Sequence, residues 1–277
     1  MLRDARYALP GRIERAFAGP DAAAAARLCA GLHRRGLLAT VGYFAASDAA
    51  PHDGLAGNLA AIAALAGAGG DTCLALKAPQ LRHDPAHIAA IAAAAAGMPM
   101  VFDAHAPREA DATLVAVERL LPKHPGTGCA LPARWRRSAN DAARLRDTTA
   151  RIRVVKGEWP DPEAPDGDEP GEAEARYLGV IAILAGRAAP VAVATHRPSL
   201  AERALAMLIE SGTPCELEQL RGLPGRRTRA LARRLGVPVR VYVPFGPGWW
   251  PYAIDKALAR PYLPGWLLRD LAGSRRD

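Results

Sequence analysis

The chain has 277 residues, of which 50% are hydrophobic, and it carries a formal net charge of +8. This length and apolar content are enough for one large folded core, and no stretch reaches the roughly 18 charge-free apolar residues that a membrane-spanning helix needs. The first residues also lack the apolar segment of a signal peptide, so we expect a cytoplasmic protein.

The spacing of the cysteines and the distribution of the charge exclude two further classes of protein. The four cysteines are far apart and form no CxxC pair, so we expect buried thiols, no disulfide framework and no metal site. Part of the positive charge is concentrated in five arginines near the C-terminal end. No aromatic side chains are interleaved with them, which favours a solvated helix face over a nucleic-acid surface. These arginines are Arg226, Arg227, Arg229, Arg233 and Arg234.

Short apolar runs alternate with longer helical stretches along the chain. A first helix is predicted over residues 21–35, ahead of the first strand, and a last one over residues 264–271. The strands are predicted at residues 38–44, 72–76, 100–103, 128–131, 152–155, 190–194, 215–219 and 237–243. The helices between them are predicted at residues 54–68, 85–97, 107–121, 138–148, 172–187, 199–211 and 226–236.

This alternation predicts the fold class. The strands are apolar at both odd and even positions, as expected when both faces of a parallel sheet are covered. About eight strand–helix units in one chain of this length indicate an α/β protein with a (β/α)₈ barrel, forming a single domain over residues 1–277. A doubly wound open sheet is the alternative, but no GxGxxG motif follows the first strand.

Polar residues stand in or just after most of the predicted strands. In a (β/α)₈ barrel the catalytic groups lie at the carboxyl ends of the strands, so these side chains should gather at one mouth. Lys77 and Asp103, on neighbouring strands, could form an ion pair there. The full set is Lys77, Asp103, Arg153, Lys156, Thr195, His196, Glu216, Glu218 and Tyr242.

The segments that carry these residues resemble strands of bacterial proline dehydrogenases. Residues 151–159, RIRVVKGEW, resemble the RLVKGAY strand of that family, and residues 215–222, CELEQLRG, resemble FEFQMLYG. Residues 239–252 are similar to its last strand and helix start, VYVPYG and WYPY. Weaker similarities link residues 36–44 to GxxxTLDYLGE, 74–77 to SVKLS, 101–104 to the DAE strand and 194–196 to ATH.

The resemblance implies a distorted barrel that oxidises proline to a cyclic imine by hydride transfer to FAD. The electrons would pass to a quinone or another acceptor, in proline metabolism. Its catalytic residues would be Lys77, Asp103, Arg153 and Tyr242. Its cofactor contacts would be Arg153, Val155, Lys156, Gly157, Trp159, Thr195 and His196. Its substrate contacts would be Lys77, Tyr242, Tyr252, Asp255 and Lys256.

Several positions depart from the family pattern. The two arginines that hold the proline carboxylate are replaced by Asp255 and Lys256, and the glutamine of the fourth strand by Pro132. The first-strand aspartate is Gly42, and the alanine of RLVKGAY is Glu158. An aspartate repels a carboxylate, so we expect the substrate to be a modified or carrier-bound amino acid or another amine rather than free proline.

Two other functions fit the same residues. A barrel without catalytic activity could serve as a binding or scaffold protein, because Pro132 and Asp255 remove expected contacts. A flavin-free lyase could use Lys77 as an amine nucleophile, although Asp103 would keep that amine charged. Trp266 and Arg269 also lie in a weak amphipathic segment that could associate with a membrane.

Overall fold

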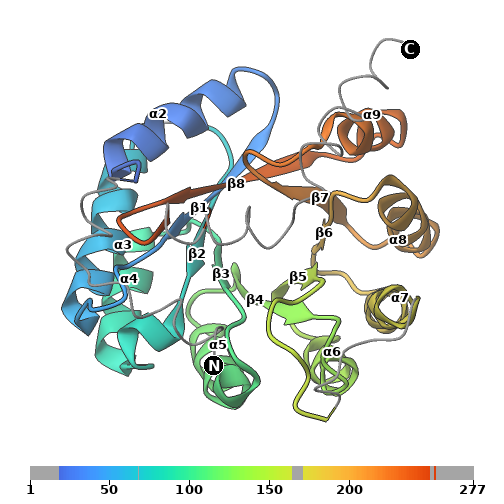
Figure 1. Ribbon diagram of the computed structural model, residues 1–277, viewed down its shortest axis with the longest axis horizontal. Coiled ribbons are helices and arrows are strands. Elements are labelled where there is room, and N and C mark those ends of the chain that lie inside the picture. The colour runs from blue at the N-terminus through green and yellow to red at the C-terminus, as the bar shows by residue number, and fades with distance from the viewer. Residues whose placement is uncertain (1–18, 68, 164–170, 250–252, 254–277) are drawn as a thin grey trace.

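A computed structural model describes residues 19–67, 69–163, 171–249 and 253 of the chain. Within these residues eight parallel strands close into a barrel in the order β1 to β8, with β1 paired to both β2 and β8 (Figure 1). The strands are β1 (Leu38–Tyr43), β2 (Thr72–Leu76), β3 (Met100–Phe102), β4 (Thr127–Pro132), β5 (Arg151–Val155), β6 (Val191–Ala194), β7 (Cys215–Leu220) and β8 (Val239–Phe245). The predicted (β/α)₈ barrel is therefore confirmed.

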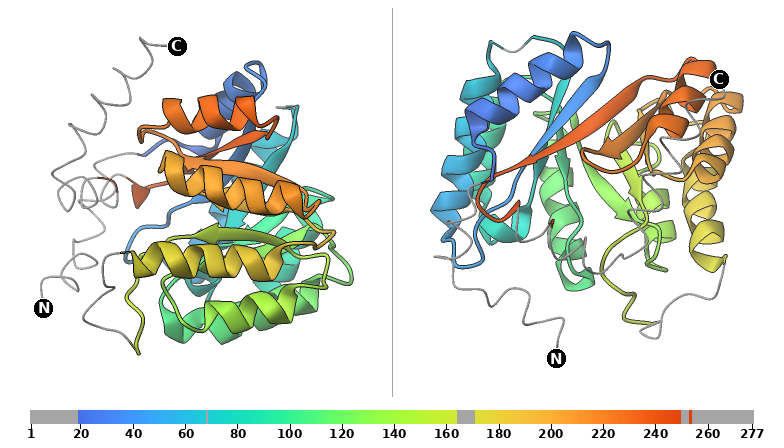
Figure 2. Two further views of the ribbon diagram at one scale, coloured as in Figure 1. Left: turned by 90° about the vertical axis from the view of Figure 1, so that its right-hand side faces the viewer. Right: turned by 45° about the horizontal axis from the view of Figure 1, so that its top comes forward.

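Helices form a ring outside the strands, as Figures 1 and 2 show. They are α2 (Ala22–His33), α3 (Pro51–Leu65), α4 (Pro85–Ala95), α5 (Ala110–Leu120), α6 (Ser138–Leu145), α7 (Glu172–Leu184), α8 (Pro198–Glu210) and α9 (Arg226–Arg234). Two short 3₁₀ turns, η2 (Ala78–Leu81) and η3 (Pro107–Glu109), follow β2 and β3. Since the strands are covered on both faces, nearly all of their residues are buried.

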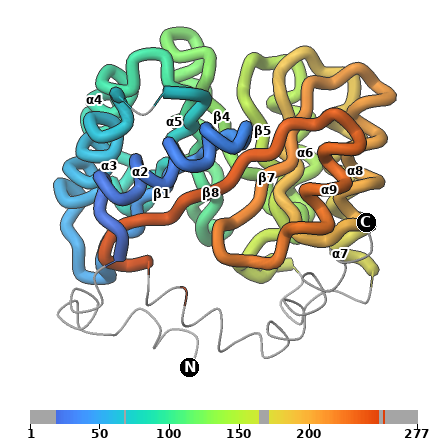
Figure 3. The backbone as a smooth tube through the Cα atoms, turned by 90° about the horizontal axis from the view of Figure 1, so that it is seen from above, coloured from blue at the N-terminus to red at the C-terminus, as the bar shows by residue number. Residues whose placement is uncertain are grey.

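The extra N-terminal helix, α2, lies against α3, β1 and β8 (Figure 3). Asp21 caps its first turn by accepting a hydrogen bond from the Ala24 amide at 2.6 Å. Asp84 caps α4 in the same way, directly before Pro85. The second predicted extra helix, residues 264–271, lies outside the described residues.

The described helices end one to three residues before their predicted last residues, and α3 and α5 also differ by three residues at their starts. Helix α3 begins at Pro51 rather than at residue 54, because Pro51 suits a first turn and Asp53 accepts a hydrogen bond from the Ala50 amide at 2.8 Å. The stretch from Pro107 starts as the 3₁₀ turn η3 before α5 continues it. No helix within the described ranges is long and apolar enough to span a bilayer.

The amino-terminal half of the barrel interior is filled by an ion-pair network. Arg240, 1% exposed, donates from Nε to Glu216 Oε1 at 2.8 Å and from Nη2 to Asp71 Oδ1 at 3.0 Å. Arg151 also pairs with Glu216. The prediction that Glu216 belongs to the group at the mouth is therefore wrong, because its side chain points toward the opposite end of β7. Polar groups at that end of a barrel usually serve stability.

Three of the four cysteines are buried, as predicted, and the fourth is not. Cys29, Cys73 and Cys129 are at most 1% exposed, while Cys215 is partly exposed. All four are free thiols. Burial raises the pKa of Cys29 and Cys73 to about 11 and that of Cys129 to about 12, so these thiols stay protonated at neutral pH.

Candidate active site

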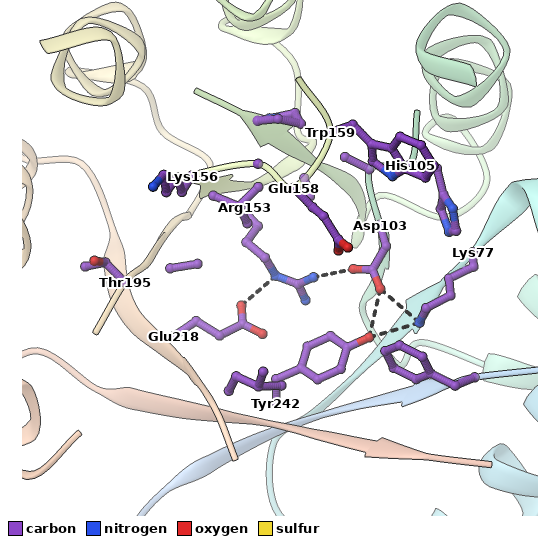
Figure 4. A pocket seen from close by; sticks show the side chains of 18 of the residues that line it. Lys77, Asp103, His105, Arg153, Lys156, Glu158, Trp159, Thr195, Glu218 and Tyr242 are labelled. Carbon is purple, nitrogen blue, oxygen red and sulfur yellow. Dashed lines mark hydrogen bonds and ion pairs between the residues drawn. The ribbon is translucent and has the colours of Figure 1, made fainter. Parts of the chain in front are cut away.

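A cavity of about 460 Å³ opens at the carboxyl ends of the strands, the end of a (β/α)₈ barrel where ligands bind. Figure 4 shows its principal side chains, which converge from several strands. The predicted residues that line it are Lys77, Asp103, Arg153, Val155, Lys156, Gly157, Trp159, Thr195, His196, Glu218 and Tyr242. Further lining comes from Phe44, Gln80, His105, Pro132, Trp135, Glu158 and Gln219.

Three side chains from β8 and from the ends of β2 and β3 form a closed triangle of polar contacts. Lys77 Nζ lies 3.1 Å from Asp103 Oδ2 and donates to Tyr242 Oη at 3.1 Å. Tyr242 Oη donates to the same Asp103 oxygen at 2.8 Å. Lys77 Nζ also lies 3.9 Å from the centre of the Phe44 ring, an arrangement that favours a cation. The triangle therefore holds one cation and one anion in fixed positions.

Gly42 of β1 makes room for this triangle. A Cβ atom at position 42 would lie 1.9 Å from Tyr242 Oη and 2.5 Å from Tyr242 Cζ. Any side chain at this position would therefore displace the phenol from Lys77 and Asp103. Tyr242 can therefore take this position because residue 42 is a glycine rather than the aspartate expected from the family pattern.

Arg153 of β5 crosses the barrel between two carboxylates. Its Nη1 donates to Asp103 Oδ1 at 2.6 Å, and its Nε donates to Glu218 Oε2 at 2.8 Å. Glu218 Oε1 in turn accepts from Thr40 Oγ1 of β1 at 2.9 Å. Arg153 is 4% exposed, yet its buried Nη2 has no hydrogen-bond partner among the described residues. Arg153 also lines the cavity, so a ligand there would lie beside a guanidinium that is not fully hydrogen-bonded.

The charges of this group reinforce one another. Burial alone raises the pKa of Asp103, but Lys77 and Arg153 outweigh it and hold that pKa below its ordinary value. Burial lowers the pKa of Arg153, yet Glu218 and Asp103 outweigh burial and raise it. Burial and Asp103 raise the pKa of the Tyr242 phenol. At neutral pH the site therefore contains a carboxylate, a guanidinium and a neutral phenol.

Burial lowers the Lys77 pKa, and Asp103 only partly offsets this effect. His105, just beyond β3, is another lining residue whose pKa is lowered. Burial and then the charge of Lys77 lower its pKa to about 4, so the imidazole is neutral at physiological pH. No hydrogen bond from the described residues reaches its ring, although it lines the cavity. Sequence reasoning missed His105; its position two residues after Asp103, at a strand end, was the available signal.

The turn after β5 carries four lining residues. Gly157 has a φ of +92°, which glycine adopts readily, and a Cβ there would lie 2.8 Å from Pro132 Cβ. Trp135 Nε1 donates to the Trp159 carbonyl at 3.0 Å, which fixes the turn against the loop after β4. Lys156 and Glu158 are exposed at the rim of the cavity.

His196, after β6, joins two loops. Its Nδ1 lies 2.6 Å from the Pro224 carbonyl, and its Nε2 accepts from the Leu220 amide at 3.0 Å. The accepting role of Nε2 assigns the proton to Nδ1, so the ring is neutral with a fixed tautomer. Neighbouring Thr195 accepts from the Arg197 amide at 3.2 Å. Both ring nitrogens of His196 are therefore occupied within the protein.

Of the predicted site residues that the structure describes, all except Glu216 line this one cavity. Tyr252, Asp255 and Lys256 lie outside the described residues, so their predicted substrate contacts stay predictions. Within the described ranges no group of three histidine, cysteine, aspartate or glutamate side chains could hold a metal ion. The cavity is lined by a guanidinium, a polarised phenol and a neutral imidazole, which suit recognition of a polar ligand.

Comparison with known proteins gives consistent similarities. No family model matches the chain. Proline dehydrogenase 1 of Bacillus subtilis subsp. natto is 25% identical over 271 residues, covering 93% of this chain and 89% of that protein. Proline dehydrogenase 1 of Bacillus subtilis strain 168 is 26% identical over 147 residues, covering 52% of this chain and 48% of that protein.

Two solved structures of proline utilization A (PutA) share the fold. The protein from Bdellovibrio bacteriovorus, inactivated by N-propargylglycine, has a TM-score of 0.68 at 17% identity, covering 90% of this chain. The protein from Corynebacterium freiburgense has a TM-score of 0.68 at 15% identity, covering 95% of this chain. This chain spans only 32% of the length of either one. At these identities the likeness concerns the barrel alone.

Proposed function

We propose, from its similarity to two proline dehydrogenases, that this chain is a divergent member of that family and an FAD-dependent oxidoreductase acting on an amine. When bound, FAD would accept a hydride at N5 from the carbon next to the amine nitrogen, giving an imine. The substrate would be a modified or carrier-bound amino acid, or another amine, and the barrel would form a single domain over residues 1–277.

The single observation that carries this proposal is the position of Arg153, which lines the cavity and keeps one guanidinium nitrogen without a hydrogen-bond partner among the described residues. An unsatisfied buried nitrogen is costly, so a polar group bound beside Arg153 is favoured. The cavity around it is within the usual size range of cofactor sites, roughly 300–1,000 Å³. Lys156 and the open backbone at Gly157 would suit the phosphate groups of FAD, and Trp159, Thr195 and His196 would provide further contacts.

The polar groups would orient the amine and control its protons. Both oxygens of Asp103 are already occupied, by Arg153 at Oδ1 and by Lys77 and Tyr242 at Oδ2, so this carboxylate would orient rather than accept a proton. The neutral ring of His105 is the lining group with an open acceptor nitrogen. It would accept an N–H hydrogen bond from the substrate amine, which must be uncharged before hydride can leave its carbon.

The charge balance of the site favours a substrate without a free carboxylate. Asp103 and Glu218 compensate both buried cations, Lys77 and Arg153. A carboxylate would have to compete with these two acidic residues and would also approach Glu158 at the rim. An ester, an amide or another uncharged group in its place would avoid this repulsion. We expect the same preference from Asp255, which replaces a carboxylate-binding arginine of the family.

One observation favours an inactive barrel as a second candidate. Pro132, at the end of β4, offers no side-chain donor where the family has a glutamine, so one expected contact to the flavin ring is lost. A protein that keeps the barrel but binds no FAD would then act as a binding or scaffold partner.

A visible absorption spectrum of the purified protein tests the proposal. We expect the flavin bands to be present, or to remain after incubation with FAD and desalting, and to bleach with dithionite. Anaerobic mixing with proline methyl ester or prolinamide should bleach them faster than free proline. A colourless protein after FAD incubation would support the inactive barrel, and ordinary turnover of free proline would refute the substrate assignment. The electron acceptor, a quinone or another oxidant, would be identified by the acceptor that restores the bands.

A further inference from the structure

Arg153 forms ion pairs with two carboxylates, Asp103 and Glu218, which differ in their other contacts. Asp103 is shared, since it contacts Lys77 and Tyr242 as well as Arg153 (Figure 4). Glu218 contacts one charged group within the described part of the chain, Arg153, through the 2.8 Å bond to Nε. With Glu218 present, the buried cations and anions of the site are equal in number.

Glu218 is about as deeply buried as Arg153, the group whose charge it balances. Its side chain is 3% exposed, and its second oxygen accepts from Thr40, which is fully buried. A carboxylate buried this deeply is stable only when it is paired and hydrogen-bonded, and both conditions are met. In the resembling strand FEFQMLYG the corresponding letter is a glutamine. The change to glutamate therefore keeps the shape of the side chain and adds one negative charge.

That charge acts on Arg153, whose side chain lines the cavity. Its Nε and Nη1 each donate to a carboxylate, and its Nη2 is buried without a hydrogen-bond partner among the described residues. A guanidinium with one carboxylate partner would attract an anion in the cavity, whereas a second carboxylate cancels much of that attraction at close range.

We propose that Glu218 is a positioning residue that fixes the Arg153 plane across the barrel and lowers the positive potential that Arg153 presents to the cavity. A group bound in the cavity beside Arg153 is therefore held better when it is neutral than when it is anionic. This inference rests on the proposed function, because the group in question is the flavin ring. A negative charge added to that ring should be stabilised less here than in a barrel with glutamine at position 218.

Sulfite binding to the FAD-loaded protein measures this effect directly. Sulfite donates its sulfur electron pair to flavin N5, which adds negative charge to the ring and removes its visible absorbance. We expect Glu218→Gln to bind sulfite about tenfold more tightly than the wild type, because one opposing charge is gone. Its midpoint potential should rise in parallel, while FAD binding remains.

Two variants serve as controls. Glu118→Gln makes the same chemical change on exposed α5, where Glu118 pairs with Arg144, and should leave the sulfite affinity unchanged. Glu218→Asp keeps the charge but withdraws it from Arg153, so its sulfite affinity should lie between those of the wild type and Glu218→Gln. It also provides the measurement should Glu218→Gln fail to fold.

The outcomes separate this inference from the proposed function. If Glu218→Gln is folded and yellow but binds sulfite like the wild type, the inference is overturned while the flavin assignment stands. The same holds if Glu218→Asp, used in its place, shows no increase. A wild-type protein that stays colourless with FAD overturns both.

Discussion

His105 differs from the other polar side chains of the cavity because no hydrogen bond from the described residues holds its ring. Burial and the nearby charge of Lys77 keep it neutral by lowering its pKa to about 4. An unfolded chain binds a proton at histidine near pH 6.5, whereas the folded chain does not until near pH 4. Between these values the unfolded state binds more protons, so the folded state loses stability as the pH falls.

This difference predicts a measurable dependence of the unfolding free energy on pH. Between pH 6.5 and pH 5, His105 should account for about 2 kcal/mol of lost unfolding free energy. The variant His105→Gln should lack this part of the loss, as urea denaturation at the two pH values would show. His52→Gln, at a side chain that is 76% exposed, is the matched control and should keep the wild-type slope. An unchanged slope in His105→Gln would mean that its imidazole is accessible to protons.

Gly42 gives a second prediction for a single residue. In Gly42→Ala the new methyl group would lie 1.9 Å from Tyr242 Oη, so either the phenol or the backbone must move. Overpacking of this kind costs about 1–3 kcal/mol of unfolding free energy. Gly179→Ala, in helix α7 with nothing within 4 Å of the added atom, should instead stabilise by about 0.5–1 kcal/mol. Urea denaturation of both variants tests the contrast, and equal stabilities would contradict it.

Among the elements, strands β7 and β8 are linked by an ion pair between buried side chains. Glu216 of β7 compensates Arg240 of β8 and also pairs with Arg151 of β5. Burial alone raises the pKa of Glu216, but these arginines outweigh burial and lower it, so the carboxylate is ionised at neutral pH. The network therefore joins three strands at the end of the barrel that is remote from the cavity.

Breaking this network should be expensive. Glu216→Gln would leave two arginines with too little compensating charge, a loss worth about 3–5 kcal/mol for a buried pair. The exposed pair of Glu118 with Arg144 offers a comparison, since Glu118→Gln should cost at most about 1 kcal/mol. Denaturant unfolding measures both. Similar losses in the two variants would show that the barrel relaxes around the unpaired arginines.

The sequence predicted the elements well because their periodicity is local information. Each predicted strand begins and ends within two residues of an observed one. The predicted helices run one to three residues too far at their ends. At their starts the errors fall where side chains decide the boundary: Pro51 and Asp53 start α3 early, and Pro107 opens with a 3₁₀ turn. The short turn η2 after β2 was missed because its four residues carry no periodic signal.

The site was predicted only in part, because its arrangement depends on distant contacts. Strand-end position was enough to bring Lys77, Asp103 and Arg153 into one cavity. It could not show that the Glu216 side chain points away from the cavity, because the residues of one strand differ only in the face to which they point and in their position along the barrel axis. Nor could it show that Gly42 and Tyr242 share one space, because that contact joins residues far apart in the chain.

At the scale of the whole molecule, a bound flavin should stabilise the fold. A ligand that binds only the folded state at a concentration 100 times its dissociation constant adds about 2.7 kcal/mol to the unfolding free energy. We therefore expect the melting temperature to rise with FAD concentration, and more so than with riboflavin, which lacks the phosphates that Lys156 and Gly157 would bind. A melting temperature that does not change with FAD would contradict this expectation.

Because three of the thiols are buried, their chemical modification would report unfolding of the protein. Cys29, Cys73 and Cys129 lie on three different elements, α2, β2 and β4, and all are protonated and buried. An alkylating reagent would reach them only when the barrel opens. The number of modified thiols per molecule, read by mass spectrometry after a brief pulse, should therefore pass from few to all in one step, without any dye or engineered label.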